Sequence, residues 1–137
     1  MLSPDPTPRV PSRSESKNSV DWLRQRAWVE VDLNALSHNV REIKRLISSE
    51  TDLMAVVKAD AYGHGAVSVA QTVLKTGASW LGVATIPEGI ELRQAGITAP
   101  IVVLGATYTP EQICAIAQWQ LQPTVCTPQQ ALVFSQQ

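Results

Sequence analysis

One lysine stands in a sequence context suited to covalent chemistry. Lys58 directly follows an apolar run, residues 53–57, that is typical of a strand buried on both faces. Partial desolvation at the end of such a strand favours the neutral amine, which is the form that attacks an aldehyde. The product would be a Schiff base with a substrate carbonyl or with an aldehyde cofactor. The alternative is structural: the lysine packs its aliphatic stem at a sheet edge and extends its amine into water.

The residues after this lysine form a glycine-containing loop that could border a ligand. Gly63 and Gly65 allow the backbone to turn tightly or to approach a bound molecule closely. Tyr62, four residues after Lys58, is placed to direct its hydroxyl at an anion. The segment therefore combines a nucleophile, a hydrogen-bond donor and permissive backbone within eight residues, 58–65.

A repeated alternation of strands and helices must position this segment. Short apolar runs predict strands, and segments with helical periodicity follow each of them. Three of the helices open with Thr at the N-cap and Glu or Gln three residues later, a pattern that satisfies two backbone donors. The predicted strands cover residues 28–33, 53–57, 80–84, 101–104 and 121–126, and the predicted helices follow Asp32, Gly65, Thr85, Thr109 and Thr127.

This alternation predicts an α/β fold with a parallel sheet. An open, doubly wound sheet that binds a nucleotide usually has a third glycine and a downstream acidic residue, which Gly63 and Gly65 lack. A (β/α)8 barrel is therefore favoured, although it needs roughly 250 residues and eight units. We expect the N-terminal half of a (β/α)8 barrel, truncated after about four βα units and preceded by one extra strand and helix.

Composition limits the classes of function. The 137 residues are 45% hydrophobic and 17% charged, with a net charge of −1, which allows one packed domain. This balance does not favour nucleic acid or an anionic membrane as a partner. No stretch approaches the roughly 20 apolar residues of a membrane-spanning helix. His38 and His64 have no Cys or carboxylate cluster at ligand spacing, so no metal site is predicted.

The chain has two regions of different composition. Residues 1–26 are rich in Pro and Ser and have no apolar core of a secretion signal, so we predict a disordered leader. Residues 27–137 contain the strand–helix alternation and are predicted to form the partial barrel domain.

Two segments resemble the N-terminal region of the bacterial alanine racemase family. Residues 28–33 (WVEVDL) are similar to its first strand, and residues 56–65 (VVKADAYGHG) match its pyridoxal phosphate attachment signature. The likeness continues through residues 87–93 (PEGIELR) and extends from about Arg26 to the end of the chain. The resemblance implies an isomerase of fold type III that uses pyridoxal 5'-phosphate. It would interconvert L- and D-alanine in the cytoplasm for peptidoglycan precursors.

The resemblance also implies roles for three residues. Lys58 would hold the cofactor as an aldimine and, once released, act as the base for the D-enantiomer. The cofactor ring would act as the electron sink. Tyr62 would contact the cofactor phosphate, and Leu104, at the end of the third barrel strand, would line the cofactor pocket. The substrate would be alanine, and the full-length family is homodimeric.

Other parts of the family's machinery have no counterpart in these 137 residues. The second base, the arginine for the substrate carboxylate and the late phosphate-binding loops come later in the family. We therefore expect an N-terminal fragment without appreciable racemase activity on its own. Two alternatives remain: a barrel protein that binds pyridoxal phosphate without catalysis, and a gene remnant that has lost its fold or pairs with a partner.

Overall fold

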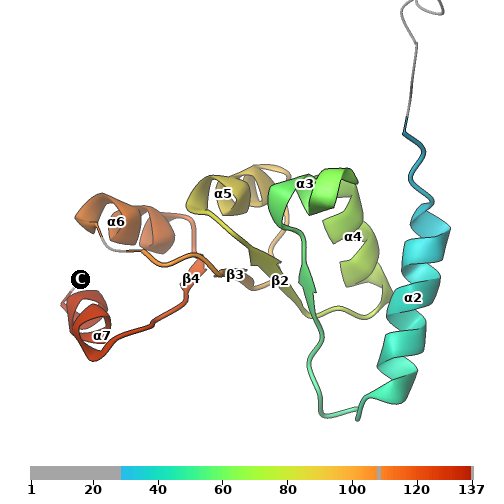
Figure 1. The fold of residues 1–137 in the computed structure, drawn as a ribbon, viewed down its shortest axis with the longest axis horizontal. Helices are drawn as coiled ribbons and strands as arrows, with labels where there is room; N and C mark the ends of the chain where they lie inside the picture. The colour runs from blue at the N-terminus through green and yellow to red at the C-terminus, as the bar shows by residue number, and fades with distance from the viewer. Residues whose placement is uncertain (1–28, 108, 137) are drawn as a thin grey trace, which may run out of the picture. The chain divides into compact units, whose positions relative to one another are not determined.

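Four short parallel strands, each followed by helical structure, make up most of the described chain (Figure 1). The computed structural model describes residues 29–107 and 109–136, and from Val31 on these belong to one unit. The elements in chain order are α2 (Leu33–Leu46), β1 (Met54–Val56), α3 (Lys58–Gly63), α4 (Ala66–Thr76), β2 (Trp80–Val83), α5 (Ile86–Gln94), β3 (Ile101–Val103), α6 (Pro110–Gln118), β4 (Gln122–Pro123) and α7 (Pro128–Ser135).

The strands form one sheet in the order β1-β2-β3-β4, and every neighbouring pair is parallel. Ala55 pairs with Leu81, and Leu81 pairs in turn with Ile101. The carboxyl ends of all four strands therefore lie at the same edge of the sheet. Strands that pair in sequence order are what a barrel requires.

The core lies on one face of this sheet. Leu81, Val83, Ile101 and Val103 are at most 1% exposed and pack in one cluster with residues of α4, α5 and α6. On the opposite face, Met54 is 40% exposed. A doubly wound sheet has helices on both faces, whereas a barrel has them on the outside only. The one-sided core therefore confirms the α/β fold with the start of a barrel.

The predicted helix starts are confirmed, with one difference. Asp32 Oδ1 accepts from the N–H groups of Asn34 and Ala35, at 2.8 and 3.1 Å, and so caps α2. Thr85 and Thr109 open α5 and α6 with complete capping boxes. At α7, Thr127 accepts from the N–H of Gln130, but the Gln130 side chain accepts from the N–H of Cys126 instead of closing the box.

Arg93 links the end of α5 to two later loops. Its Nη1 donates to the carbonyls of Ile97 and Ala99, both at 2.7 Å. Its Nε donates to Trp119 O at 3.1 Å, and its Nη2 donates to Gln120 O at 2.9 Å. Burial lowers the pKa of Arg93, but the guanidinium stays charged at neutral pH. One cation thus satisfies four carbonyls at the amino-terminal side of the sheet.

The prediction of a first strand at residues 28–33 is wrong within the described chain. Val29 to Asp32 have no strand structure and Leu33 begins α2, while residue 28 and the predicted leader lie outside the described residues. A strand needs a ladder partner, and the described sheet contains only β1 to β4. The predicted helix that follows is confirmed as α2, which packs against α4.

Two predicted strands are also shorter than expected. The strand at 53–57 is observed at Met54–Val56, and its burial on both faces is wrong because Val56 is 37% exposed. It is an edge strand whose second face is uncovered. The strand at 121–126 is reduced to Gln122–Pro123, where Pro123 has no N–H to extend the ladder.

No helix within residues 29–107 and 109–136 has the length and apolar character needed to cross a membrane.

Candidate functional site

Lys58 lies at the carboxyl edge of the sheet, as predicted. It follows β1 after the buried Val57, whose N–H donates to Gly82 O at 2.8 Å and so continues the pairing with β2. Lys58 itself is half-buried. The strand therefore fixes the backbone up to the lysine, and the amine is left near the edge where neighbouring strands end.

The chain turns in a left-handed sense directly after Lys58. Ala59, Asp60, Ala61 and Tyr62 have φ between 51° and 57° and ψ between 36° and 51°, which are the angles of a left-handed helix. Four consecutive residues other than glycine in this region are uncommon, because each costs roughly 1–2 kcal/mol. The turn is therefore strained, and other interactions must hold it.

Several hydrogen bonds within the segment hold this turn. The N–H of Ala61 donates to Val57 O at 2.9 Å, and the N–H of Gly65 donates to Asp60 O at 3.0 Å. The Asp60 carboxylate accepts from the N–H of Ala66 at 2.6 Å, which caps the first turn of α4. Ala61 is buried in the core, so packing also anchors the turn.

Glu88 of α5 adds a contact from a different βα unit. Its Oε1 accepts from the N–H of Ala59 at 2.9 Å, and its Oε2 accepts from the N–H groups of Ala84 and Thr85 at 2.7 and 3.0 Å. Burial alone would raise the pKa of Glu88. The backbone donors Ala59, Thr85 and Ala84 and the Thr85 side chain outweigh burial, so the pKa of Glu88 lies below its ordinary value. The site thus contains a stable carboxylate next to the lysine turn.

The two other predicted site residues lie on either side of β2. Tyr62 ends the left-handed turn and is 61% exposed, so its hydroxyl is accessible to a ligand. Leu104 follows β3 and is 38% exposed. A β-carbon built on Gly82 of β2 would lie 3.4 Å from both Leu104 Cδ1 and Val56 Cγ2, so Leu104 and Val56 approach each other across Gly82. Lys58 and Leu104 consequently share the carboxyl edge of the sheet.

The glycine loop between the turn and α4 is open to the outside. Gly63 and Gly65 have φ of +85° and +87°, and a β-carbon on either would meet no atom within 4 Å. Glycine is therefore favoured at both positions by the backbone angle and not by crowding. The surface next to the loop is open. His64, which lies between them, has its Nδ1 at 2.9 Å from Ala61 O, so this histidine supports the turn.

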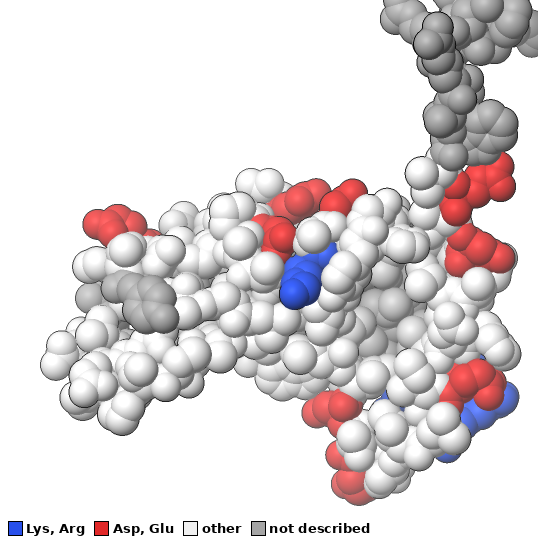
Figure 2. All heavy atoms as spheres, viewed as in Figure 1, with Lys and Arg blue, Asp and Glu red and all other residues white. Residues whose placement is uncertain are grey.

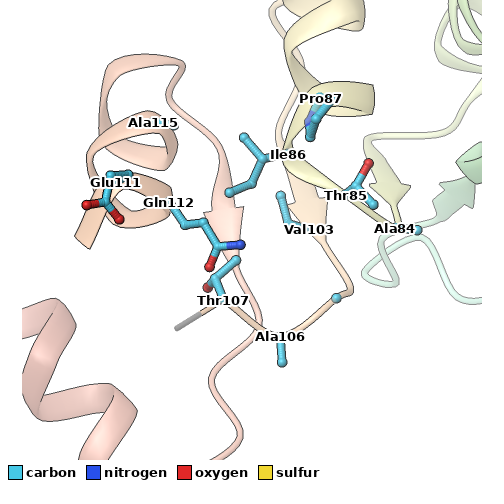
Figure 3. Close-up of a pocket in the computed structure, with 11 residues that line it drawn as sticks. Ala84, Thr85, Ile86, Pro87, Val103, Ala106, Thr107, Glu111, Gln112 and Ala115 are labelled. Atoms are coloured by element: carbon cyan, nitrogen blue, oxygen red, sulfur yellow. The ribbon is translucent and has the colours of Figure 1, made fainter. Parts of the chain in front are cut away.

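One hollow of the described structure lies elsewhere along the same edge. It encloses about 600 Å³ between the starts of α5 and α6. Figure 3 shows Thr107 and Gln112 facing each other on one side of it, opposite Ile86 and Val103. Lys58 is not among its lining residues. The hollow holds no amine for covalent attachment, so the candidate site is the lysine turn.

Acidic and basic groups lie close together in part of the surface. Figure 2 shows one group of basic atoms near the middle of the view, beside acidic and uncharged atoms, and another near the end of α2. In α2, Arg45 pairs with Glu42 at 2.6 Å. Within residues 29–107 and 109–136, no three His, Cys, Asp or Glu side chains gather as metal ligands would.

Sequence reasoning proposed Lys58, Tyr62 and Leu104 as site residues but did not predict the contact of Glu88 with Ala59. The pattern identified Glu88 only as the partner of Thr85 in a capping box. No local signal marks its bond to a residue 29 positions earlier. The left-handed turn was missed as well, since only Asp60 belongs to a residue type enriched at positive φ.

The chain matches known proteins over nearly all of its described length. The family model for the alanine racemase N-terminal domain matches residues 31–137. An alanine racemase from Nostoc sp. is 72% identical over 114 residues, covering 83% of this chain and 30% of that protein. One from Synechocystis sp. is 64% identical over 113 residues, covering 82% of this chain and 30% of that protein.

Solved structures agree with these matches. The alanine racemase of Bacillus anthracis with bound L-Ala-P has a TM-score of 0.72 and 44% identity, covering 78% of this chain and 28% of that chain. The alanine racemase of Clostridium difficile 630 in complex with cycloserine has a TM-score of 0.73 and 42% identity, covering 80% and 29%. This chain thus spans less than a third of the length of these relatives. The match over residues 31–137 shows that the chain belongs to the alanine racemase N-terminal domain family.

Proposed function

We propose that this chain forms the cofactor-attachment region of an alanine racemase, with Lys58 as the residue that binds pyridoxal 5'-phosphate covalently. The observation that carries the proposal is the position of Lys58. This residue follows a parallel strand and precedes the left-handed turn, and hydrogen bonds hold the backbone on both sides of it, at Val57 and at Ala59. An amine held at the carboxyl edge of a barrel sheet is suited to attack an aldehyde.

The residues around Lys58 fit this cofactor. A β-carbon built on Gly63 or Gly65 would meet no atom within 4 Å, so a ligand can approach this loop, and the exposed Tyr62 can offer its hydroxyl to a phosphate. Leu104, partly exposed at the same edge, offers an apolar contact. When bound, pyridoxal phosphate supplies an electron sink for the charge left by a departing α-proton. Lys58 Nζ would first attach the aldehyde and, when free, exchange a proton with the α-carbon of alanine.

The activity of a whole racemase is a further part of the proposal, because the chain spans only about 30% of the first relatives. For the whole protein we propose, from its family, the interconversion of L- and D-alanine, a homodimer, a cytoplasmic location and a supply of D-alanine for peptidoglycan. For the 137 residues alone we expect attachment of the cofactor without appreciable racemisation.

Borohydride trapping tests the proposal directly. The chain is incubated with pyridoxal phosphate, reduced, digested and mapped by mass spectrometry, with Lys44 and Lys75 as internal references. We expect a pyridoxyl group on Lys58 at cofactor concentrations that leave the reference lysines unmodified. Lys58→Arg keeps the charge but cannot form the adduct, so it should remain unlabelled.

The outcomes separate the proposed function from its alternatives. Equal labelling of Lys58, Lys44 and Lys75 would contradict selective attachment. Selective labelling combined with chirally pure alanine after long incubation would indicate cofactor binding without racemisation by these residues. D-alanine formation that disappears in Lys58→Arg would extend the proposal to catalysis by the chain itself.

A further inference from the structure

The Glu88 carboxylate does more than start helix α5. A capping box requires only that the side chain at the third helical position accepts from the backbone of the N-cap residue. Glu88 fulfils this requirement with Oε2, which accepts from the N–H of Thr85. Its second oxygen accepts from the N–H of Ala59, the residue that follows Lys58. The carboxylate therefore connects the carboxyl ends of β1 and β2.

The two later helices offer an internal comparison, because both have glutamine at the corresponding position. In α6, Gln112 Oε1 accepts from the N–H of Thr109 at 3.1 Å, so a glutamine closes a capping box in this chain. In α7, Gln130 Nε2 donates to Thr107 O at 2.7 Å. In Gln130, therefore, the side-chain oxygen accepts a hydrogen bond and the side-chain nitrogen faces a carbonyl oxygen, so an amide matches both partners.

At Glu88 the second side-chain atom faces a donor instead. The N–H of Ala59 requires an acceptor, which a carboxylate offers at both oxygens and a glutamine offers at only one. The glutamate is therefore explained by the contact with Ala59 and not by the capping box. Among the described residues, this hydrogen bond joins the turn to α5, whereas the other hydrogen bonds of the turn lie within residues 57–66.

We propose that Glu88 is a positioning residue for Lys58, because it fixes the peptide after the lysine to the end of β2. The strained turn begins at Ala59, directly after Lys58, so a movement of the turn would carry the lysine backbone with it. Val57 is held by Gly82 on one side of Lys58, and Ala59 is held by Glu88 on the other. The inference rests on the proposed function in one respect, namely that Lys58 is the residue that reacts.

The substitution Glu88→Gln tests this role with little change in shape. By analogy with α6 it should retain the capping box, and it should lose the bond to Ala59. Glu91→Gln is the matched control, since Glu91 is an exposed carboxylate on the same helix. Circular dichroism should show the same helix content in both variants and in the unmodified chain.

Two readouts are needed, and the first uses the chain without cofactor. Amide hydrogen exchange by NMR should show the Ala59 N–H exchanging about tenfold faster in Glu88→Gln, the equivalent of one hydrogen bond to a charged group. The second readout is pyridoxyl labelling of Lys58 as a function of pH. We expect a lower plateau of the labelling rate in Glu88→Gln, with Lys44, Lys75 and the Glu91→Gln chain unchanged.

Each contrary result has a defined meaning. Unchanged exchange at Ala59 would overturn the proposal, because the bond would not hold the turn. Faster exchange at Ala59 with an unchanged plateau of the labelling rate would also overturn the proposal. A shift in the midpoint of the pH profile without a lower plateau would overturn it too, because Glu88 would then act on Lys58 only through its charge. If Lys58 of the unmodified chain labels no faster than Lys44, the proposed function fails, while the hold of Glu88 on the turn is still decided by the exchange at Ala59.

Discussion

Replacing Ala59 with glycine tests whether the turn after Lys58 is left-handed and strained. Ala59 has φ 51° and ψ 51°, and its side chain is exposed, so the substitution removes little packing. In an ordinary right-handed helix an Ala→Gly substitution destabilises a protein by roughly 0.5–1 kcal/mol. At a left-handed position the sign should reverse, because glycine adopts this conformation without a clash.

The magnitude follows from two opposing terms. Relief of the left-handed conformation contributes roughly 1–2 kcal/mol of stability for one residue. The more flexible unfolded chain offsets about 0.4–1 kcal/mol of this gain. From the central values of these two ranges, we therefore expect Ala59→Gly to raise the free energy of unfolding by about 0.8 kcal/mol. The backbone hydrogen bond from Ala59 to Glu88 needs no side chain and is kept.

Urea unfolding followed by tryptophan fluorescence measures this difference, with Trp80 and Trp119 as reporters in the described domain. The control is Ala117→Gly, at an exposed position of the right-handed helix α6. It should lose roughly 0.5–1 kcal/mol, so that the two variants differ by about 1–2 kcal/mol. The reasoning is refuted if Ala59→Gly loses as much stability as Ala117→Gly.

Three further predictions concern contacts near or behind the site. The unmodified chain should be more stable than Glu88→Gln, with the full difference above pH 4.5 and none in strong acid. Folding lowers the pKa of Glu88, so the ionised carboxylate stabilises the fold above its unfolded pKa, and this stabilisation is lost as the pH falls through the folded pKa. Unfolding measured at a series of pH values checks this, and a stability difference independent of pH would contradict it. Arg93→Met removes four hydrogen bonds and should cost roughly 3–5 kcal/mol in urea unfolding, at about 1 kcal/mol for each bond. Its control, Arg45→Met in an exposed ion pair, should cost less than about 0.5 kcal/mol, and equal losses would argue against the role of Arg93. Gly105→Ala would place a β-carbon against the backbone carbonyl oxygen of Ala84, so it should lower stability by about 1–3 kcal/mol in thermal unfolding; an unchanged midpoint would show that the loop yields.

Much of the architecture could be predicted because its signals are local. The helix α4 is predicted to follow Gly65, and the structure has it at Ala66–Thr76. Thr85 and Thr109 marked two helix starts, since a capping box joins residues only three positions apart. The strand periods were sufficient for a parallel α/β fold, but not for the lengths of the edge strands, which depend on the presence of a neighbour.

The sequence by itself determined the order of the elements and the position of Lys58 directly after the first barrel strand, because hydrophobic periodicity and capping residues act over a few positions. Only the tertiary structure decided how that lysine is held. The left-handed angles at Ala59 to Tyr62 are imposed on residues that do not prefer them. The bond from Ala59 to Glu88 joins residues 29 positions apart, so it exists only once β1 and β2 have paired and brought their carboxyl ends together.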